Sequence, residues 1–109
     1  MVSTAAEDLR RSYRVAFLRF LPRRDEAALL TGYDIGRQAL SAGVGTATIA
    51  AAHHAVLSEA LAGLAKADDA GPVLASAELF LAEVLAPYDL AGRAVTDLAT
   101  PPDAAGAAP

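Results

Sequence analysis

Residues 29–40, Leu-Leu-Thr-Gly-Tyr-Asp-Ile-Gly-Arg-Gln-Ala-Leu, and residues 46–57, Thr-Ala-Thr-Ile-Ala-Ala-Ala-His-His-Ala-Val-Leu, decide the fold. Apolar or small residues recur in both stretches at steps of three and four, which is the spacing of one helix face. Between them, Gly43 can take the left-handed conformation that closes a helix, and Thr46 can cap the next helix. Because the connection is short, we expect the two helices to be antiparallel and side by side.

The same spacing predicts a helix over residues 4–21. Thr4 and Glu7 have the arrangement of a capping box. Pro22 is expected to end the helix, because a proline disfavours the helical conformation of the residue before it. Arginines lie off the apolar stripe, and they form either a solvated face, the plainer interpretation, or a surface for an acidic partner. The stripe is Leu9, Tyr13, Ala16, Phe17 and Phe20, and the arginines are Arg10, Arg11, Arg14 and Arg19.

Two glycines lie one turn apart in the second predicted helix, which Asp25 can cap. Gly32 and Gly36 each cost a helix about 1 kcal/mol relative to alanine. Close approach of another backbone is the usual compensation, so we expect Gly36 at a tight helix crossing. Tyr33 lies on the neighbouring face and is interpreted as an aromatic residue at the edge of the core, with contact to a partner as the alternative.

The third predicted helix, residues 46–66, carries both histidines of the chain, His53 and His54. Adjacent residues point about 100° apart around a helix, whereas a helical zinc pair needs a spacing of three or four. We therefore expect no metal site. His53 falls on the apolar stripe and is interpreted as a packed, hydrogen-bonded residue, and His54 is expected nearer the surface.

A fourth helix is predicted from Pro72 to about Leu98. Its apolar surface is wide, which suits a central helix or one that also faces a second subunit. Pro87 removes one backbone hydrogen bond, so we expect a kink within residues 83–87. Together the segments predict an all-α, four-helix antiparallel bundle with short loops over residues 1–99, which forms a homodimer. Residues 100–109 are predicted to be a disordered tail or linker.

Composition narrows the function further. The net charge of −4 makes nucleic acid a poor partner, and the absence of cysteine excludes thiolate metal sites and cysteine nucleophiles. No signal peptide and no apolar run long enough to span a bilayer is visible, so we expect a cytoplasmic protein without membrane contact. No paired carboxylates, nucleophile–base order or phosphate loop indicates an enzyme. We therefore expect no catalytic residue, no cofactor and no metal.

Four motifs, in this order and spacing, resemble the N-terminal domain of the bacterial stress phosphatase RsbU and its actinobacterial relatives. The first is Arg-Asp-Glu-Ala-Ala-Leu at residues 24–29, and the second is Tyr-x-x-Gly-Arg-x-Ala-Leu at residues 33–40. The third is Gly-x-x-Thr-x-x-Ile at residues 43–49, followed by His53. The fourth is Phe-Leu-x-Glu-x-Leu-x-Pro-Tyr-Asp-Leu at residues 80–90. The resemblance covers roughly residues 8–95.

This resemblance implies an all-helical, homodimeric regulatory domain in stress-response signalling. In the family, such a domain precedes a metal-dependent serine phosphatase domain or another signalling module. It binds a switch kinase of the anti-sigma type, and that partner switching activates the phosphatase. We expect this chain itself to lack the phosphatase catalytic domain. Carried onto this sequence, the partner-binding surface comprises Glu26, Leu30 and Arg37 on the second helix and Glu83 and Ala86 on the fourth, and we add Tyr33 as a candidate contact.

The alternative is a histidine phosphotransfer domain, which is also a small four-helix bundle. His54 would then be the phosphoacceptor. Such domains usually place a lysine and a glycine soon after the histidine, to neutralise and admit the phosphoryl group. Here Glu59 provides a carboxylate where a cation is needed, which disfavours this interpretation. Incubation with a phosphorylated receiver domain would separate the two functions.

Overall fold

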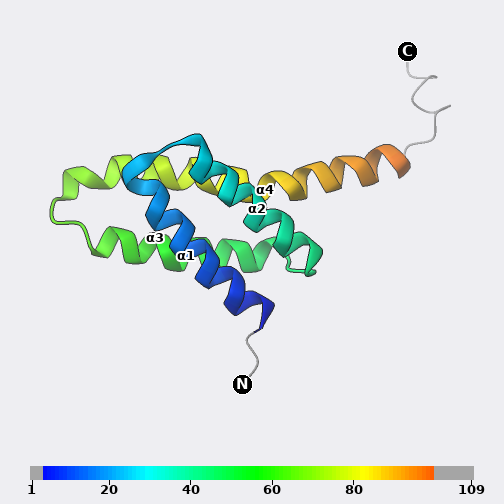
Figure 1. The fold of residues 1–109 in the computed structure, drawn as a ribbon, viewed down its shortest axis with the longest axis horizontal. Coiled ribbons are helices and arrows are strands. Elements are labelled where there is room, and N and C mark those ends of the chain that lie inside the picture. The colour runs from blue at the N-terminus through cyan, green and yellow to red at the C-terminus, as the bar shows by residue number, and fades with distance from the viewer. Residues whose placement is uncertain (1–3, 100–109) are drawn as a thin grey trace, which may run out of the picture.

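The computed structural model describes residues 4–99, and four α-helices follow one another within that range. α1 spans Ala5–Arg23, α2 Glu26–Ser41, α3 Thr46–Ala62 and α4 Ala70–Ala99, and a short 3-10 turn, η1, at Ala67–Asp69 precedes α4. Figure 1 shows the helices running alternately back and forth, with α4 extending beyond the other three. The predicted all-α, four-helix architecture is confirmed.

The first helix begins where its sequence predicts and ends later. The hydroxyl oxygen of Thr4 accepts a hydrogen bond from the Glu7 N–H at 3.1 Å. The prediction that Pro22 ends this helix is wrong, because α1 continues through Pro22 to residue 23. Arg24 closes it with a left-handed φ of 50°, and its N–H donates to the Phe20 carbonyl at 2.7 Å. Burial of Phe20 favours a helical last turn and outweighs the local preference of the residue before a proline.

A glycine closes α2 as predicted. Gly43 has a φ of 77°, which only glycine adopts at little cost. The Val44 N–H donates to the Ala39 carbonyl at 2.9 Å, and the Gly43 N–H donates to the Leu40 carbonyl at 3.1 Å. These two bonds form a Schellman motif, which satisfies the last carbonyls of the helix. At the other end, the Asp25 carboxylate accepts from the N–H of residue 28 at 3.0 Å, so the predicted aspartate cap is confirmed.

α3 begins at Thr46 as predicted, but its N-cap and its last residue differ from the prediction. Gly45, not Thr46, is the N-cap, and no side chain caps this end. The predicted threonine cap is therefore wrong by one residue. The helix ends at Ala62 rather than at residue 66, and Gly63 is its C-cap, with an N–H that donates to the Glu59 carbonyl at 3.2 Å. Glycine has the lowest helix propensity after proline, which accounts for the early end.

The expectation that α2 and α3 lie side by side is wrong. Within the described residues these two helices do not pack against each other. Instead α2 packs against α1 and, most extensively, α4, whereas α3 packs against α1 and α4. Gly32 lies against Phe80 and Gly36 lies against Val84, so α2 and α4 are neighbours that run in the same direction (Figure 1). The loop reverses the chain but leaves the two helices on opposite sides of the α1–α4 contact.

The closest approach in the fold is at Gly36. A Cβ atom on Gly36 would lie 1.9 Å from the carbonyl oxygen of Val84, which is a backbone atom of α4. The prediction of a tight helix crossing at this residue is therefore confirmed. One turn earlier, a Cβ atom on Gly32 would lie 3.1 Å from the ring of Phe80. The two glycines together allow the backbones of α2 and α4 to approach.

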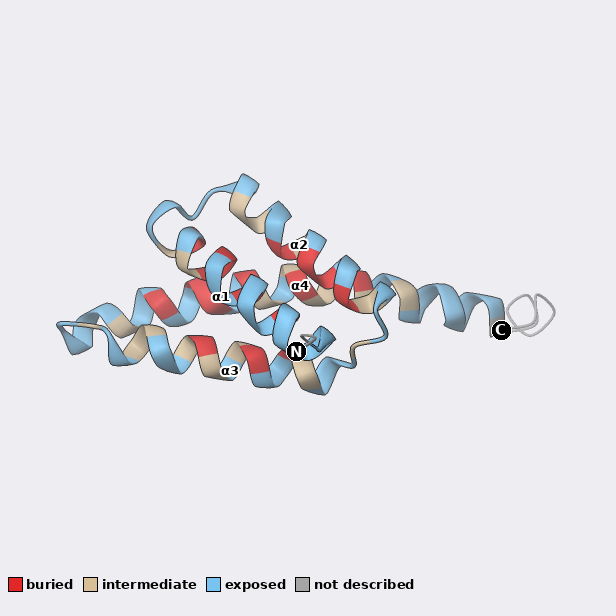
Figure 2. Cartoon of the chain, turned by 60° about the horizontal axis from the view of Figure 1, so that its bottom comes forward, coloured by how far each residue is buried: buried red, intermediate tan, exposed pale blue. Residues whose placement is uncertain are grey.

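The core centres on aromatic rings where α1 meets α4. The ring centroid of Phe80 lies 5.1 Å from that of Tyr13, 5.6 Å from that of Phe17 and 5.8 Å from that of Phe20. The Tyr13 pair is edge to face, a favourable arrangement for aromatic rings. All five residues of the predicted α1 stripe are buried, and Figure 2 shows the buried positions gathered where the helices face one another.

Only part of α4 is covered by the other helices. Val84 is fully buried, whereas Val95 and Leu98, near the end of α4, are exposed. Figure 2 shows the end of α4 extending beyond the other helices. The helix is continuous through the buried Pro87, and the kink expected there stays a prediction. The tail predicted over residues 100–109 lies outside the described residues.

One described segment, residues 67–98, is long and apolar enough to cross a membrane by length and composition alone. No such segment was expected from the sequence, because charged residues interrupt its apolar runs. A core helix of a soluble protein meets the same criterion. In this fold Val73, Ala77 and Phe80 from that segment are buried in the core.

Candidate partner-binding surface

Four of the predicted contact residues share one face of α2. Glu26, Leu30, Tyr33 and Arg37 are separated by steps of four, three and four, which places them on one side of a helix. Leu30 is 63% exposed, Glu26 and Arg37 are exposed, and Tyr33 is half-buried. Arg37 lies 3.7 Å from Asp34 across an exposed ion pair of the kind that contributes little to stability. This face therefore presents a large apolar side chain between charges.

The matching face of α4 contains the other two predicted residues and two leucines that were not among the predicted contacts. Glu83 and Ala86 are half-buried. Leu79 and Leu90 continue their spacing in both directions and are 57% and 53% exposed. The spacing alone could have identified these leucines as part of the surface, since positions 79, 83, 86 and 90 repeat the steps of four, three and four of the α2 stripe.

The α2 stripe and the α4 stripe are neighbours because the two helices pack side by side and run in the same direction. Arg37 and Glu83 are each next in sequence to a residue of the crossing, Gly36 and Val84. A different face of α2, which contains Ile35, lines the groove between α1 and α2. A different face of α4, which contains residues 81 and 85, lines the groove between α3 and α4. The structure thus brings the six predicted residues onto the side of the α2–α4 pair that faces away from α1 and α3. We call this side, with the two leucines, the α2–α4 surface.

The histidine predicted to be packed and hydrogen-bonded is confirmed in that role. Nδ1 of His53 lies 2.8 Å from the hydroxyl oxygen of Tyr13, a fully buried residue of α1. Burial lowers the pKa of His53, and the neighbouring His54 lowers it further. Burial also raises the pKa of the Tyr13 phenol. Both shifts favour the neutral forms, and the pair joins α1 to α3. His54 is exposed, as expected.

Stability is expected to fall when the pH decreases from 7.5 to 5.5, because of His53. Unfolded histidine has a pKa near 6.5. Since the folded pKa of His53 is lower, the unfolded chain binds a proton that the folded chain does not, and stability is lost as the pH falls through 6.5. The slope is at most about 1.4 kcal/mol per pH unit. Thermal unfolding followed by circular dichroism measures it.

The control is the adjacent, exposed histidine. His53→Gln should flatten the dependence between pH 5.5 and 7.5, whereas His54→Gln should keep most of it. Equal slopes in the two variants and the parent chain would assign the effect to other groups.

An ion pair between α1 and α3 bears on the phosphotransfer alternative. Nη2 of Arg14 lies 2.7 Å from a carboxylate oxygen of Glu59, and Nε lies 3.0 Å from both oxygens. The hydrogen bond from Arg14 lowers the pKa of Glu59, and Glu59 raises the pKa of Arg14. Arg14 is thus engaged by Glu59, which follows His54 on α3, whereas a phosphoryl group on His54 would need a cation that is free to pair with it.

The described residues include no group of three histidine, aspartate or glutamate side chains that could hold a metal ion.

An exposed apolar stripe across two neighbouring helices is typical of small α-helical domains that bind other proteins.

The chain belongs to the family described as phosphoserine phosphatase RsbU, N-terminal domain, whose model matches residues 11–91. The match is to the N-terminal domain of that phosphatase and not to its catalytic domain. Searches among curated proteins and among solved structures each gave no match.

Proposed function

We propose that the chain is a non-catalytic regulatory domain that dimerises and binds a protein partner in the bacterial cytoplasm. The proposed partner is a switch kinase of the anti-sigma type, which acts in stress-response partner switching and activates a serine phosphatase. The supporting observation is the exposed apolar α2–α4 surface in a member of the RsbU N-terminal domain family.

The composition of the α2–α4 surface supports a protein partner. Leu30, Leu79 and Leu90 are each more than half exposed, and full burial of a leucine contributes about 1.5–3 kcal/mol. Charged residues, among them Arg37 and Glu83, border the leucines, which matches the apolar centre and polar rim of protein interfaces. A few such anchors supply most of the binding free energy in typical complexes.

Leu30→Asp is expected to weaken binding of the purified switch kinase by at least about 30-fold, the effect of losing an interface hot spot. The substitution places a charge in an apolar contact, which the interface cannot solvate. Helicity should be unchanged, because Leu30 is 63% exposed in the unbound domain. A binding titration and circular dichroism measure the two quantities.

The matched control is Leu74→Asp. Leu74 is 48% exposed on α4 and lies off the α2–α4 surface, so this variant should bind the kinase as the parent chain does. Normal binding by Leu30→Asp would place the contact elsewhere. Unfolding of Leu30→Asp would show that Leu30 belongs to the core.

A dimer is the expected state in solution. Val95 and Leu98 on the extended end of α4 are 66% and 88% exposed, and a second subunit would remove them from water. Sedimentation equilibrium should give twice the chain mass of 11.1 kDa. A mass equal to that of one chain at micromolar concentration would contradict the dimer.

A further inference from the structure

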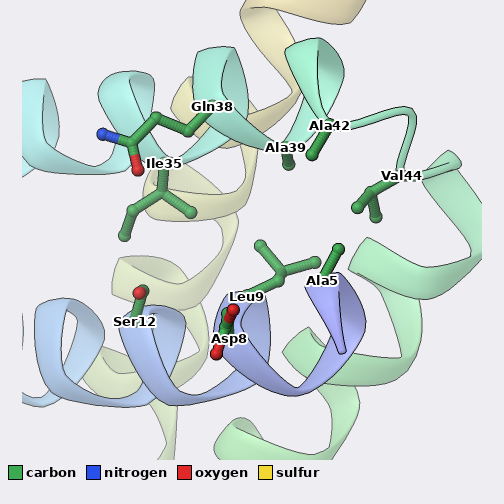
Figure 3. Close-up of a pocket in the computed structure, with 9 residues that line it drawn as sticks. All are labelled: Ala5, Asp8, Leu9, Ser12, Ile35, Gln38, Ala39, Ala42 and Val44. Atoms are coloured by element: carbon green, nitrogen blue, oxygen red, sulfur yellow. The ribbon is translucent and has the colours of Figure 1, made fainter. Parts of the chain in front are cut away.

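Two open grooves follow one another along one side of the contact between α1 and α2. The first, of about 190 Å³, lies between the start of α1 and the end of α2, where Figure 3 shows side chains of both helices facing one another. The second, of about 680 Å³, lies between the end of α1 and the start of α2. Among the lining positions, one spacing of three and four residues runs through both grooves: 5, 8, 12, 15, 19 and 22 on α1, and 28, 31, 35, 38 and 42 on α2. They therefore form a single α1–α2 seam.

The seam has the length and shape of a site for a helix. From Ala5 to Pro22 it extends for roughly 26 Å at the helical rise per residue, which is nearly five turns. Small side chains at Ala5, Ala28 and Ala42 line it and allow a backbone to come close. It is distinct from the α2–α4 surface, because Ile35 and the other seam residues lie on a different face of α2.

The charge at one end of the seam is unbalanced. Arg19 and Arg23 line the second groove, and Arg24 follows them in sequence. In residues 4–99, no ion pair joins any of these three arginines to a carboxylate, whereas other arginines of the chain are paired. Asp25 also lines the second groove, where its carboxylate caps α2, so three arginines stand against one carboxylate at this end. Three unpaired cations are therefore concentrated at one end of an otherwise acidic chain with net charge −4.

Apolar groups lie between these cations. Val15 is 43% exposed in the seam, Leu18 is half-buried, and Pro22 is exposed beside them. A ligand that pairs with the arginines must therefore also offer apolar side chains. Nucleic acid meets only the first condition, and its affinity depends on more phosphate contacts than three cations can provide.

We propose that the α1–α2 seam binds an amphipathic helix of another protein, with carboxylates at the end that lies against Arg19 and Arg23. Arginine and carboxylate form strong, geometrically specific hydrogen bonds. The apolar face of the partner helix covers Val15 and Pro22, as in other complexes where a helix occupies a groove. The inference does not depend on the proposed function, since it uses a different surface.

Two designed helical peptides of about 18 residues, the length of the seam, test the proposal. Both carry leucine and alanine along one face. One has glutamates in its first turn, where the helix dipole favours them, and the other has lysines at the same positions. The full chain is expected to bind the glutamate peptide in calorimetric titrations. Arg19→Glu with Arg23→Glu should weaken that binding by about tenfold or more and should create binding of the lysine peptide.

The control double variant, Lys66→Glu with Arg93→Glu, changes the net charge equally at two exposed residues outside the seam and should bind the glutamate peptide as the parent chain does. A neutral pair, Arg19→Gln with Arg23→Gln, serves if the charge-reversed chain fails to fold, and it should weaken binding without creating affinity for lysines. Amide chemical shifts should change along residues 5–22 and 28–42 and not along residues 79–90.

Several results would overturn the assignment. These are no binding of the glutamate peptide, equal losses in the two charge-reversed variants, and shifts confined to α4. Tighter binding of phosphatidylserine vesicles or of duplex DNA than of the peptide would also overturn it, because the seam would then recognise phosphate rather than a protein helix.

Discussion

Replacing Gly36 with alanine is expected to lower the free energy of unfolding by about 1 to 3 kcal/mol, the usual cost of overpacking. The new Cβ atom would lie 1.9 Å from the Val84 carbonyl oxygen, and a backbone atom cannot turn aside as a flexible side chain can. α2 and α4 would have to separate. Helix propensity alone predicts the opposite sign, a gain of about 1 kcal/mol. Urea unfolding followed by circular dichroism measures the change, and the sign decides between the two effects.

Gly92→Ala is the matched control for this substitution. Gly92 also lies inside a helix, but it is exposed, and a Cβ atom there would meet nothing within 4 Å. It should therefore gain up to about 1 kcal/mol of stability from helix propensity. If Gly36→Ala gained as much as Gly92→Ala, the crossing of α2 and α4 would be looser than the structure shows.

Phe80→Ala should have the largest effect of any single substitution considered, a loss of about 3 to 5 kcal/mol. The side chain is fully buried, and three other aromatic rings from α1 lie within 5.1 to 5.8 Å of its centroid. Its removal leaves a cavity where α1, α2 and α4 meet. Domains are stable by only about 5 to 15 kcal/mol, so a large fraction of that stability would be lost. Urea unfolding and near-ultraviolet circular dichroism measure the loss.

The control for Phe80 is its neighbour in sequence. Leu79 is 57% exposed, so Leu79→Ala should change stability by no more than about 0.5 kcal/mol. It should nevertheless weaken binding of the proposed kinase, since Leu79 lies on the α2–α4 surface. Equal losses of stability in the two variants would contradict the placement of α4 relative to α1.

The sequence predicted the parts of the fold that depend on neighbouring residues. The buried stripe of α1 follows from the spacing of its apolar residues. The closure of α2 at Gly43 and its cap at Asp25 follow from local backbone geometry. The prediction that α1 ends at Pro22 was wrong, because the burial of Phe20 that extends the helix is a tertiary effect. The packing of α2 against α4 rather than α3 could not be predicted either, since a short loop fixes direction but not which faces meet.

The sequence predicted some of the candidate surfaces of this domain and not others. Glu26, Leu30 and the other predicted contacts came from the family resemblance, and exposure then added Leu79 and Leu90 on the adjoining helix, but binding at this surface stays a prediction. His53 was placed correctly from its position on an apolar stripe. The α1–α2 seam was missed, because alanines, polar residues and arginines line most of it and produce no hydrophobic pattern.

The exposed end of α4 has the geometry of a lever arm. Tyr88 still holds the helix to the bundle, because its hydroxyl donates to the Val44 carbonyl, and beyond it α4 continues for ten residues to Leu98, which is roughly 15 Å at the helical rise. A rotation of about 10° about Tyr88 would displace the far end by about 3 Å, simply from the length of the arm. That displacement is comparable to the spacing of about 3.8 Å between consecutive Cα atoms. The exposed length of the helix thus sets how far a small angular change at the bundle would move its end.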